Sequence, residues 1–250
     1  PGKKFKGGSG MIRTISAEWL KLRRSRIGFV IAVLPILGLL IGCANYSMNR
    51  GALQNGWYSL WTQVSLFYGE FFLPVLIAIC CAYVCRLEHL NKNWNMMLSS
   101  PVSIAAMFFA KWIVIGVLIL FAQALFMALY WLAGTLFSLG PFPMETTGWA
   151  MRGWYASLSV IALQLALSIR IRSFAVPIGV SLCAVFVGLG MHMAGLGLFF
   201  PFSLITIGMN VLNRDMLTEM QNILFWIMNM AYTIVFALVS VRLLKTNAQA

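Results

Sequence analysis

The sequence lacks the motifs that most enzymes and nucleotide-binding proteins use for their chemistry. It contains no GxxxxGK[ST] loop to cradle phosphates, no HExxH pair and no GxSxG elbow. Its two histidines, His89 and His192, are far apart, and its five cysteines form no CxxC pair. No carboxylates are paired within the apolar runs. The chain therefore does not hydrolyse ATP by itself, and a membrane-embedded enzyme is disfavoured.

Charge is also scarce. Only 10% of the residues are charged, 61% are hydrophobic and the mean hydropathy is +0.86, whereas soluble domains are about half apolar and a quarter charged. The apolar residues come in runs of about 20, the length that crosses a hydrocarbon core of about 30 Å. Such runs pair their backbone polar groups internally as helices. We therefore expect an all-α polytopic membrane protein.

Six runs are predicted as transmembrane helices within one domain, residues 11–250. They are Ile27–Tyr46, Leu66–Val84, Ala105–Ala133, Trp154–Ile169, Phe174–Phe199 and Ile223–Val241. The third exceeds one crossing, so we expect its first turns at the interface, where Lys111 extends toward water. Glycines and prolines in GLGMHMAGLGLFF indicate a broken or re-entrant helix. Residues 1–10, PGKKFKGGSG, are typical of a tag or linker remnant, and excluding their three lysines lowers the formal charge from +12 to +9.

The distribution of basic residues predicts the orientation. With the N-terminus inside, the outer segments hold three basic residues, Arg50, Arg152 and Arg214, and the inner segments hold twelve. The twelve are Arg13, Lys21, Arg23, Arg24, Arg26, Arg86, Lys92, Lys111, Arg170, Arg172, Arg242 and Lys245. Because cytoplasmic segments carry the excess of Lys and Arg, both termini are expected in the cytoplasm.

The segment MIRTISAEWLKLRRSR, ahead of the first span, is predicted to form an amphipathic helix. Its apolar arc consists of Ile12, Ile15, Trp19 and Leu22. Basic residues lie opposite this arc, which is the pattern of a helix in the membrane interface that binds anionic lipid. The alternative is ordinary cytoplasmic flanking charge with accidental periodicity.

A second amphipathic stretch, CRLEHLNKNWNMMLSSP, separates the second and third spans. Leu87, Leu90 and Trp94 share one helical face with Met97 and Leu98, and Glu88 lies on the polar face. Ser100 is suited to cap the next helix and Pro101 to its first turn. The stretch is predicted as a cytoplasmic helix followed by a hinge, with an amphipathic loop as the alternative.

Two further features lie within the apolar runs. Glu70 is the one acidic residue inside such a run, and two interpretations stay open. It is either an interfacial carboxylate near the outer end of its span, or a residue that contacts substrate or gates its passage. Gly38 and Gly42 form a GxxxG pattern, which permits close helix contact.

Several quoted segments together resemble a known family. These are AEWLKLRRSRIGFVIAVLPIL, LFYGEFFLPVLIAICCAYVCRLEHLNKNWNMMLSSPVS and the following AKW. They are similar to the permeases of lantibiotic-immunity ABC transporters, within the type-2 ABC exporters of bacteria. The resemblance is strongest over Met11–Trp112, and LEHLNKNWNMMLSSP is its most specific motif.

The resemblance implies a permease of the bacterial cytoplasmic membrane that removes lantibiotics or similar cationic antimicrobial peptides. ATP and Mg²⁺ would be bound by a separate nucleotide-binding subunit, and a second permease chain, identical or related, would complete the pore. Leu87, Glu88, Asn91 and Trp94 would then contact the ATPase. The alternatives are a type-2 permease for a lipid, drug or ion, and a scaffold or channel without an ATPase partner.

Overall fold

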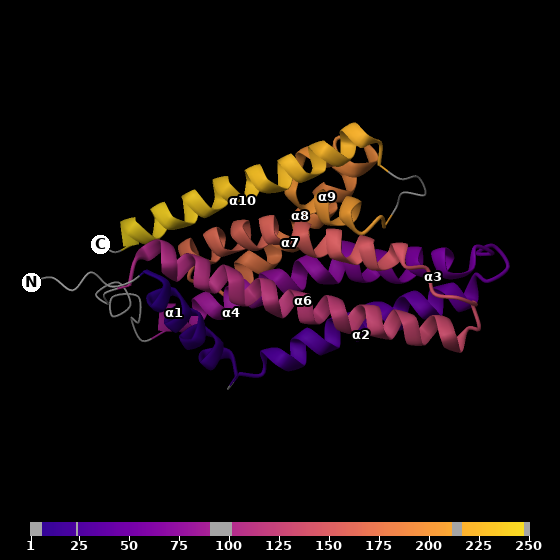
Figure 1. Cartoon of the computed structure of the whole chain (residues 1–250), viewed down its shortest axis with the longest axis horizontal. Coiled ribbons are helices and arrows are strands. Elements are labelled where there is room, and N and C mark those ends of the chain that lie inside the picture. The colour runs from indigo at the N-terminus through magenta and orange to yellow at the C-terminus, as the bar shows by residue number, and fades with distance from the viewer. Residues whose placement is uncertain (1–6, 24, 91–101, 212–216, 248–250) are drawn as a thin grey trace, which may run out of the picture.

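The chain forms an elongated bundle of helices that run roughly along one axis (Figure 1). This computed structural model describes residues 7–23, 25–90, 102–211 and 217–247. The α-helices are α1 (Gly7–Arg23), α2 (Ile27–Met48), α3 (Gly56–Ser65), α4 (Leu73–His89), α6 (Ile104–Leu136), α7 (Glu145–Arg170), α8 (Ala175–Met193), α9 (Pro201–Gly208) and α10 (Glu219–Asn247). A π-helical segment, η1 (Leu66–Phe72), joins α3 to α4, and a 3-10 turn, η3 (Gly197–Phe199), precedes α9.

Five helical segments are long and apolar enough to cross a membrane, among the residues described. They are Ile27–Met48, Gly56–His89, Ile104–Leu136, Ala175–Met193 and Glu219–Thr246. The remaining predicted span, Trp154–Ile169, lies within the 26-residue helix α7 but is not one of these five. The chain is thus a polytopic membrane protein built from helices, with five spans supported by composition.

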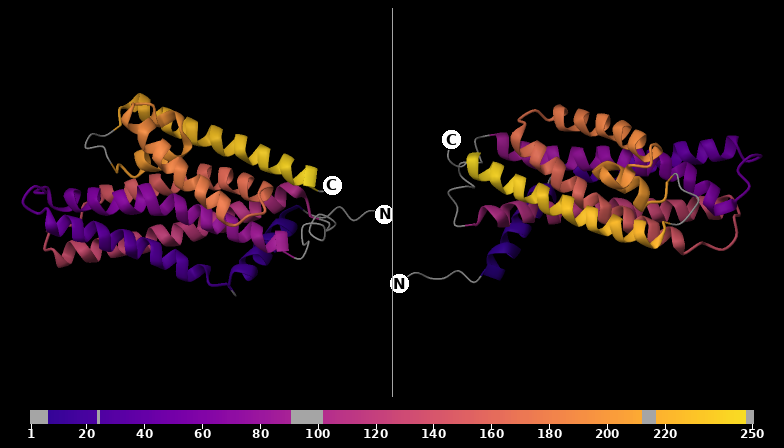
Figure 2. Two further views of the ribbon diagram at one scale, coloured as in Figure 1. Left: turned by 180° about the vertical axis from the view of Figure 1, so that it is seen from behind. Right: turned by 90° about the horizontal axis from the view of Figure 1, so that it is seen from above.

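The low hydropathy of α7 has a structural cause. This helix packs against α4, α6, α9 and α10, and it buries serine and glutamine side chains there. Ser157, Ser159 and Gln164 are each fully buried. Figure 2 shows α10 lying at an angle across the bundle. Because protein covers much of α7, its polar residues are shielded from lipid, and hydropathy underestimates its fit to the membrane interior.

The two ends of the described chain lie at the same end of the bundle. α1 and the C-terminal end of α10 lie at one end, while α3 and the start of α7 lie at the opposite end (Figure 1). This arrangement fits an even number of passes, and the side of the membrane that each end faces stays a prediction.

The second span is longer than the sequence predicted. The helical rod begins at Gly56, not at Leu66, and continues for 34 residues to His89. Its middle is π-helical: the N–H of Leu73 donates to the carbonyl of Tyr68, five residues earlier. Pro74 follows directly, and it has no N–H to give to the carbonyl of Glu70. The wider turn is therefore placed where an α-helical ladder would already be broken.

α2 approaches this rod closely through the two glycines of its GxxxG pattern. A Cβ atom at Gly42 would lie 2.5 Å from the Cα of Val64, and one at Gly38 would lie 3.0 Å from the Cβ of Tyr68. The backbones of α2 and α3 are therefore in contact at Gly42, as the pattern permits. By contrast, a Cβ at Gly28, also on α2, would meet nothing within 4 Å.

The expected helix break is present, and it lies within the predicted fifth span, Phe174–Phe199, which therefore ends earlier than predicted. α8 ends at Met193, Gly195 has φ +76°, and a single 3-10 turn leads into α9. All eight residues of α9, Pro201–Gly208, are buried. Short helical backbone of this kind is tolerated at membrane depth only when protein surrounds it, as α7, α8 and α10 do here.

Replacing Gly42 tests the close approach of α2 to α3. Gly42→Ala is expected to lower the unfolding free energy by about 1–3 kcal/mol, because the new methyl group overlaps backbone atoms of Val64. Gly28→Ala, on the same helix, is the matched control and should be neutral or slightly stabilising. Thermal unfolding in mild detergent measures both, and equal stability of the two variants would contradict the contact.

Candidate functional site

Four charged side chains meet where α1, α4 and α6 converge, near the end of the bundle that holds the C-terminus of α10. The Lys111 Nζ lies 3.0 Å from an oxygen of Glu18 and 3.0 Å from an oxygen of Glu88. The Lys21 Nζ lies 2.9 Å from Glu18 and 2.6 Å from Glu88. We call these four residues the ion cluster.

Three of the four side chains in the ion cluster are buried. The exposed fractions are 1% for the Lys111 side chain, 3% for Glu18 and 2% for Glu88, against 35% for Lys21. Removing such charges from water is costly unless opposite charges and hydrogen bonds replace the lost hydration. Two carboxylates and two ammonium groups supply that balance here. The cluster therefore holds α1 against the bundle at a defined position.

The position of Lys111 corrects one expectation. The sequence placed this residue at the interface, extending toward water, whereas its side chain is fully buried. α6 is one continuous helix of 33 residues that begins at Ile104, and the side chain of Ser103, rather than that of Ser100, accepts the capping hydrogen bond from the N–H of Ala106. Lys111 lies two turns inside this helix and faces the two carboxylates. The pairing, not the membrane surface, explains a lysine in this apolar run.

The predicted contact residues for an ATPase are only partly described. Asn91 and Trp94 lie outside the described residues, as do Ser100 and Pro101. Leu87 is half-buried, and the carboxylate of Glu88 faces Lys21 and Lys111 within the chain. These two residues belong to the last turns of α4, since helix continues from the span to His89 and Leu90 is extended. The predicted polar-face carboxylate therefore points into the bundle.

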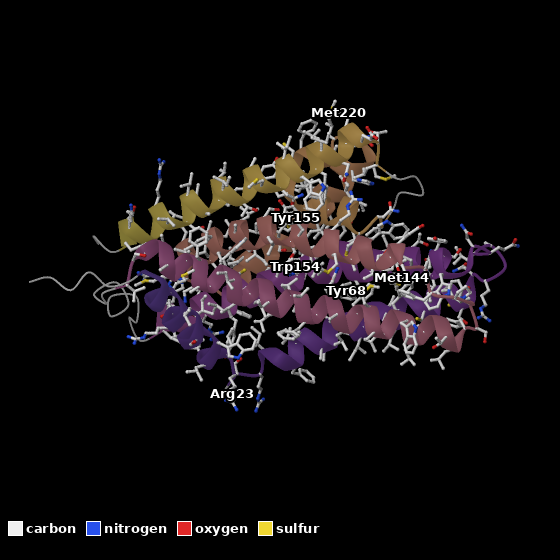
Figure 3. All side chains as sticks on the ribbon, in the orientation of Figure 1. Arg23, Tyr68, Met144, Trp154, Tyr155 and Met220 are labelled. Atoms are coloured by element: carbon white, nitrogen blue, oxygen red, sulfur yellow. The ribbon has the colours of Figure 1, made fainter. Side chains whose placement is uncertain are left out.

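The helix predicted ahead of the first span forms, its location in the membrane interface stays a prediction, and its apolar residues divide between two environments. α1 covers Gly7–Arg23, so it begins four residues ahead of Met11. Leu22 is buried and Ile15 half-buried, whereas Ile12 is 67% and Trp19 39% exposed. The outward residues provide an apolar surface, which suits contact with lipid. Figure 3 places Arg23 at the corner between α1 and α2.

Glu70 lies deep in the protein, in the π-helical segment. It is 3% exposed, and its carboxylate accepts a short hydrogen bond from the hydroxyl of Thr206 on α9. Because the rod begins at Gly56, Glu70 is not at a helix N-terminus, which was the premise of the interfacial interpretation. Tyr68, near the middle of the bundle in Figure 3, stacks on Phe126 with ring centroids 4.1 Å apart. Its hydroxyl is buried without a hydrogen-bond partner in the described part of the chain.

Sequence reasoning found the members of the ion cluster but not their association. Glu18 and Lys21 lie in the quoted AEWLKLRRSR segment, Glu88 was predicted on the polar face of the second amphipathic stretch, and Lys111 was predicted at the membrane interface. The signal that could have found this association is the scarcity of acidic residues, because Glu18 and Glu88 are two of only six in the chain. In an apolar protein such charges require partners. The partner of Glu70, Thr206, carried no comparable signal.

The comparisons with known proteins agree with this architecture. Residues 14–188 match the family model described as ABC-2 family transporter protein, a stretch that includes all four members of the ion cluster and Glu70. No curated protein matched the chain.

The two lysines of the ion cluster are expected to contribute unequally to the unfolding free energy, because Lys111 is buried and Lys21 is partly exposed. Lys111→Met is expected to lower the unfolding free energy by about 3 kcal/mol, because it leaves Glu18 and Glu88 buried beside each other with less compensation. Lys21→Met removes contacts to the same carboxylates from a partly exposed position, so the expected loss is about 1 kcal/mol or less. Denaturant titration of the purified variants measures the difference. A larger loss for Lys21→Met would show that the cluster is not held by its buried lysine.

Proposed function

The chain belongs to the ABC-2 family of transporter proteins, and we propose that it is the permease subunit of an exporter that removes lantibiotics or similar cationic antimicrobial peptides from the bacterial membrane. It is a multi-pass protein of the cell membrane. The family match spans 14–188, well over half of the 250 residues. The peptide substrate rests on the similarity of the LEHLNKNWNMMLSSP passage to lantibiotic-immunity permeases.

Energy for export would come from a separate nucleotide-binding subunit that binds ATP and Mg²⁺. The sequence has no phosphate-binding loop of its own. The expected contact surface is the end of α4 and the residues that follow it, with Leu87, Asn91 and Trp94 as the partner-facing candidates. A second permease chain, identical or related, would complete the assembly. The basic residues near this end of the bundle support its placement in the cytoplasm.

The observation that carries the coupling proposal is the ion cluster. Glu88 lies three residues before Asn91, and its carboxylate contacts lysines of both α1 and α6. A displacement of the α4 end by the ATPase would therefore act on the interfacial helix and on a membrane-spanning helix together. In this proposal Glu88 transmits motion inside the permease instead of pairing with the partner.

Glu70 is proposed to gate the passage of substrate. It joins the π-helical middle of the long rod to α9, and π-helical turns occur often at functional sites. A buried carboxylate held by one hydroxyl can exchange that partner when helices move.

Export of peptides is tested by growth. Cells that carry the chain together with its nucleotide-binding subunit are expected to tolerate higher lantibiotic concentrations than cells with either protein alone. An ATPase variant that cannot hydrolyse ATP should abolish the gain. Tolerance to an amphipathic cationic drug but not to peptides would instead assign another substrate.

The same strain tests the coupling surface. Trp94→Ala is expected to reduce peptide tolerance without reducing the amount of permease in the membrane, because the ATPase loses an aromatic anchor. Trp131→Ala is a control, since this tryptophan is 53% exposed on α6. Copurification in mild detergent reports the ATPase contact directly, and undiminished tolerance in Trp94→Ala would remove Trp94 from the surface.

Replacing Glu70 separates gating from folding. Glu70→Gln keeps a hydrogen-bond acceptor for Thr206 but removes the charge, so the variant should fold and show severalfold lower peptide-stimulated ATP hydrolysis in the assembled transporter. Glu219→Gln, at an exposed acidic residue that begins α10, should retain full stimulation. Normal stimulation in Glu70→Gln would assign the carboxylate a structural role only.

A further inference from the structure

A cavity opens at the end of the bundle opposite the ion cluster. Its volume is about 590 Å³, and its walls come from residues 52–55, the first turns of α3, the start of α7 and Asn210. Cavities of about 300–1,000 Å³ are the usual size for sites that bind small molecules or single chemical groups of larger ones. Neither the family match nor the ion cluster accounts for this cavity.

Aromatic rings form one part of the cavity wall. Tyr58, Trp61 and Trp149 all line it. The ring of Trp149 lies 5.9 Å from that of Tyr58 and 5.8 Å from that of Trp61, measured between centroids. Trp61 is fixed because its indole N–H donates to the carbonyl of Met209 at 3.0 Å. Grouped aromatic faces favour apolar groups and cations, since each ring face carries partial negative charge.

A carboxylate completes the wall. Glu145, the first residue of α7, accepts a hydrogen bond from the Tyr58 hydroxyl at 3.1 Å through one oxygen, Oε2. The other oxygen has no hydrogen-bond partner among the residues that the structure describes. Gln54 and Asn55 also line the cavity, and their amide groups can accept hydrogen bonds as well as donate them. The cavity thus presents hydrogen-bond acceptors and a negative charge beside the rings.

The described basic residue closest in sequence to the cavity-lining residues 52–55 does not neutralise Glu145. Arg50 precedes the cavity-lining residues, but its guanidinium lies over the rings of Phe137, at 4.8 Å, and Tyr46, at 5.7 Å. It also donates to the carbonyl of Phe137 at 3.4 Å. No described lysine or arginine forms an ion pair with Glu145. The carboxylate of Glu145 therefore lines the cavity without a counter-ion in the part of the chain that the structure describes.

We propose that this cavity binds an ammonium group carried on an apolar body. The carboxylate and amide oxygens accept the N–H donors, the rings surround the charge, and the apolar remainder of the ligand lies against the indoles. An anion would meet Glu145 unfavourably, and a neutral alcohol would lose the charge interaction. The inference does not rest on peptide export, because it concerns equilibrium binding by the permease alone.

Simple amines test the chemistry. The full chain, in nanodiscs of phosphatidylglycerol, is titrated with pentylammonium, 1-pentanol and pentanoate, and binding is followed by ligand-observed NMR. Pentylammonium is expected to bind most tightly. Glu145→Gln should weaken its binding about threefold to tenfold, an effect limited by the solvent exposure of this carboxylate. Equal binding of the three probes, or undiminished binding to Glu145→Gln, would overturn the proposal.

Matched variants separate recognition from damage to the fold. Glu219→Gln removes an acidic side chain that does not line the cavity, so it should bind pentylammonium like the unmodified chain. Trp149→Phe keeps an aromatic face and should retain most of the affinity, whereas Trp149→Leu should lose about twofold to fivefold. A thermal unfolding scan of each variant shows whether it is folded. If Trp149→Leu and Trp149→Phe bind equally, the rings do not hold the cation.

The source of the ammonium group is identified by competition. Nanodiscs that contain phosphatidylethanolamine weaken pentylammonium binding if the occupant is a lipid head group. A soluble lysine-containing peptide displaces pentylammonium from phosphatidylglycerol nanodiscs if the occupant is a peptide side chain. Either competition supports ammonium recognition, and failure of both to compete overturns it.

Discussion

The contact of Lys111 with Glu18 and Glu88 is the interaction on which the arrangement of this protein depends. Two of the six acidic residues in the chain form ion pairs with this one buried lysine. These two glutamates belong to helices that are far apart in sequence. Leu22 and Ile15 also pack α1 against the core, but such apolar contacts are not directional. Directional charge pairs fix one position instead.

The acidic residues mark each place where function is proposed. Glu18 and Glu88 belong to the ion cluster, Glu70 joins the rod to α9, and Glu145 lines the cavity at the opposite end. Helices connect all three places, since Glu88 and Glu70 lie on the same rod and the cavity contains the first turns of that rod. A permease that couples ATP hydrolysis at one face to release at the other needs a connection of this kind.

The hydrophobic runs in the sequence predicted most helices of this fold. They could not predict which charged residues form ion pairs. Length and hydropathy located α2, α6, α8 and α10 because lipid contact selects apolar residues directly. They missed the extension of the second span to Gly56, where Ser59 and Thr62 interrupt the apolar run although α2 and α6 cover this part of the rod. Pairing of Lys111 with Glu18 joins residues 93 positions apart, and no local periodicity encodes such a separation. The burial of Glu70 could not be predicted from local sequence either, because it results from a tertiary contact with α9.

The π-helical turn between α3 and α4 has a rotational consequence. An α-helix advances about 100° per residue, so each residue accommodated in a wider turn offsets the two halves of a rod by about that angle. The face that carries Trp57 and Trp61 toward α6 is therefore rotated relative to the face that carries Glu88 toward Lys111. A straight α-helix of the same length would lack this offset between its two halves.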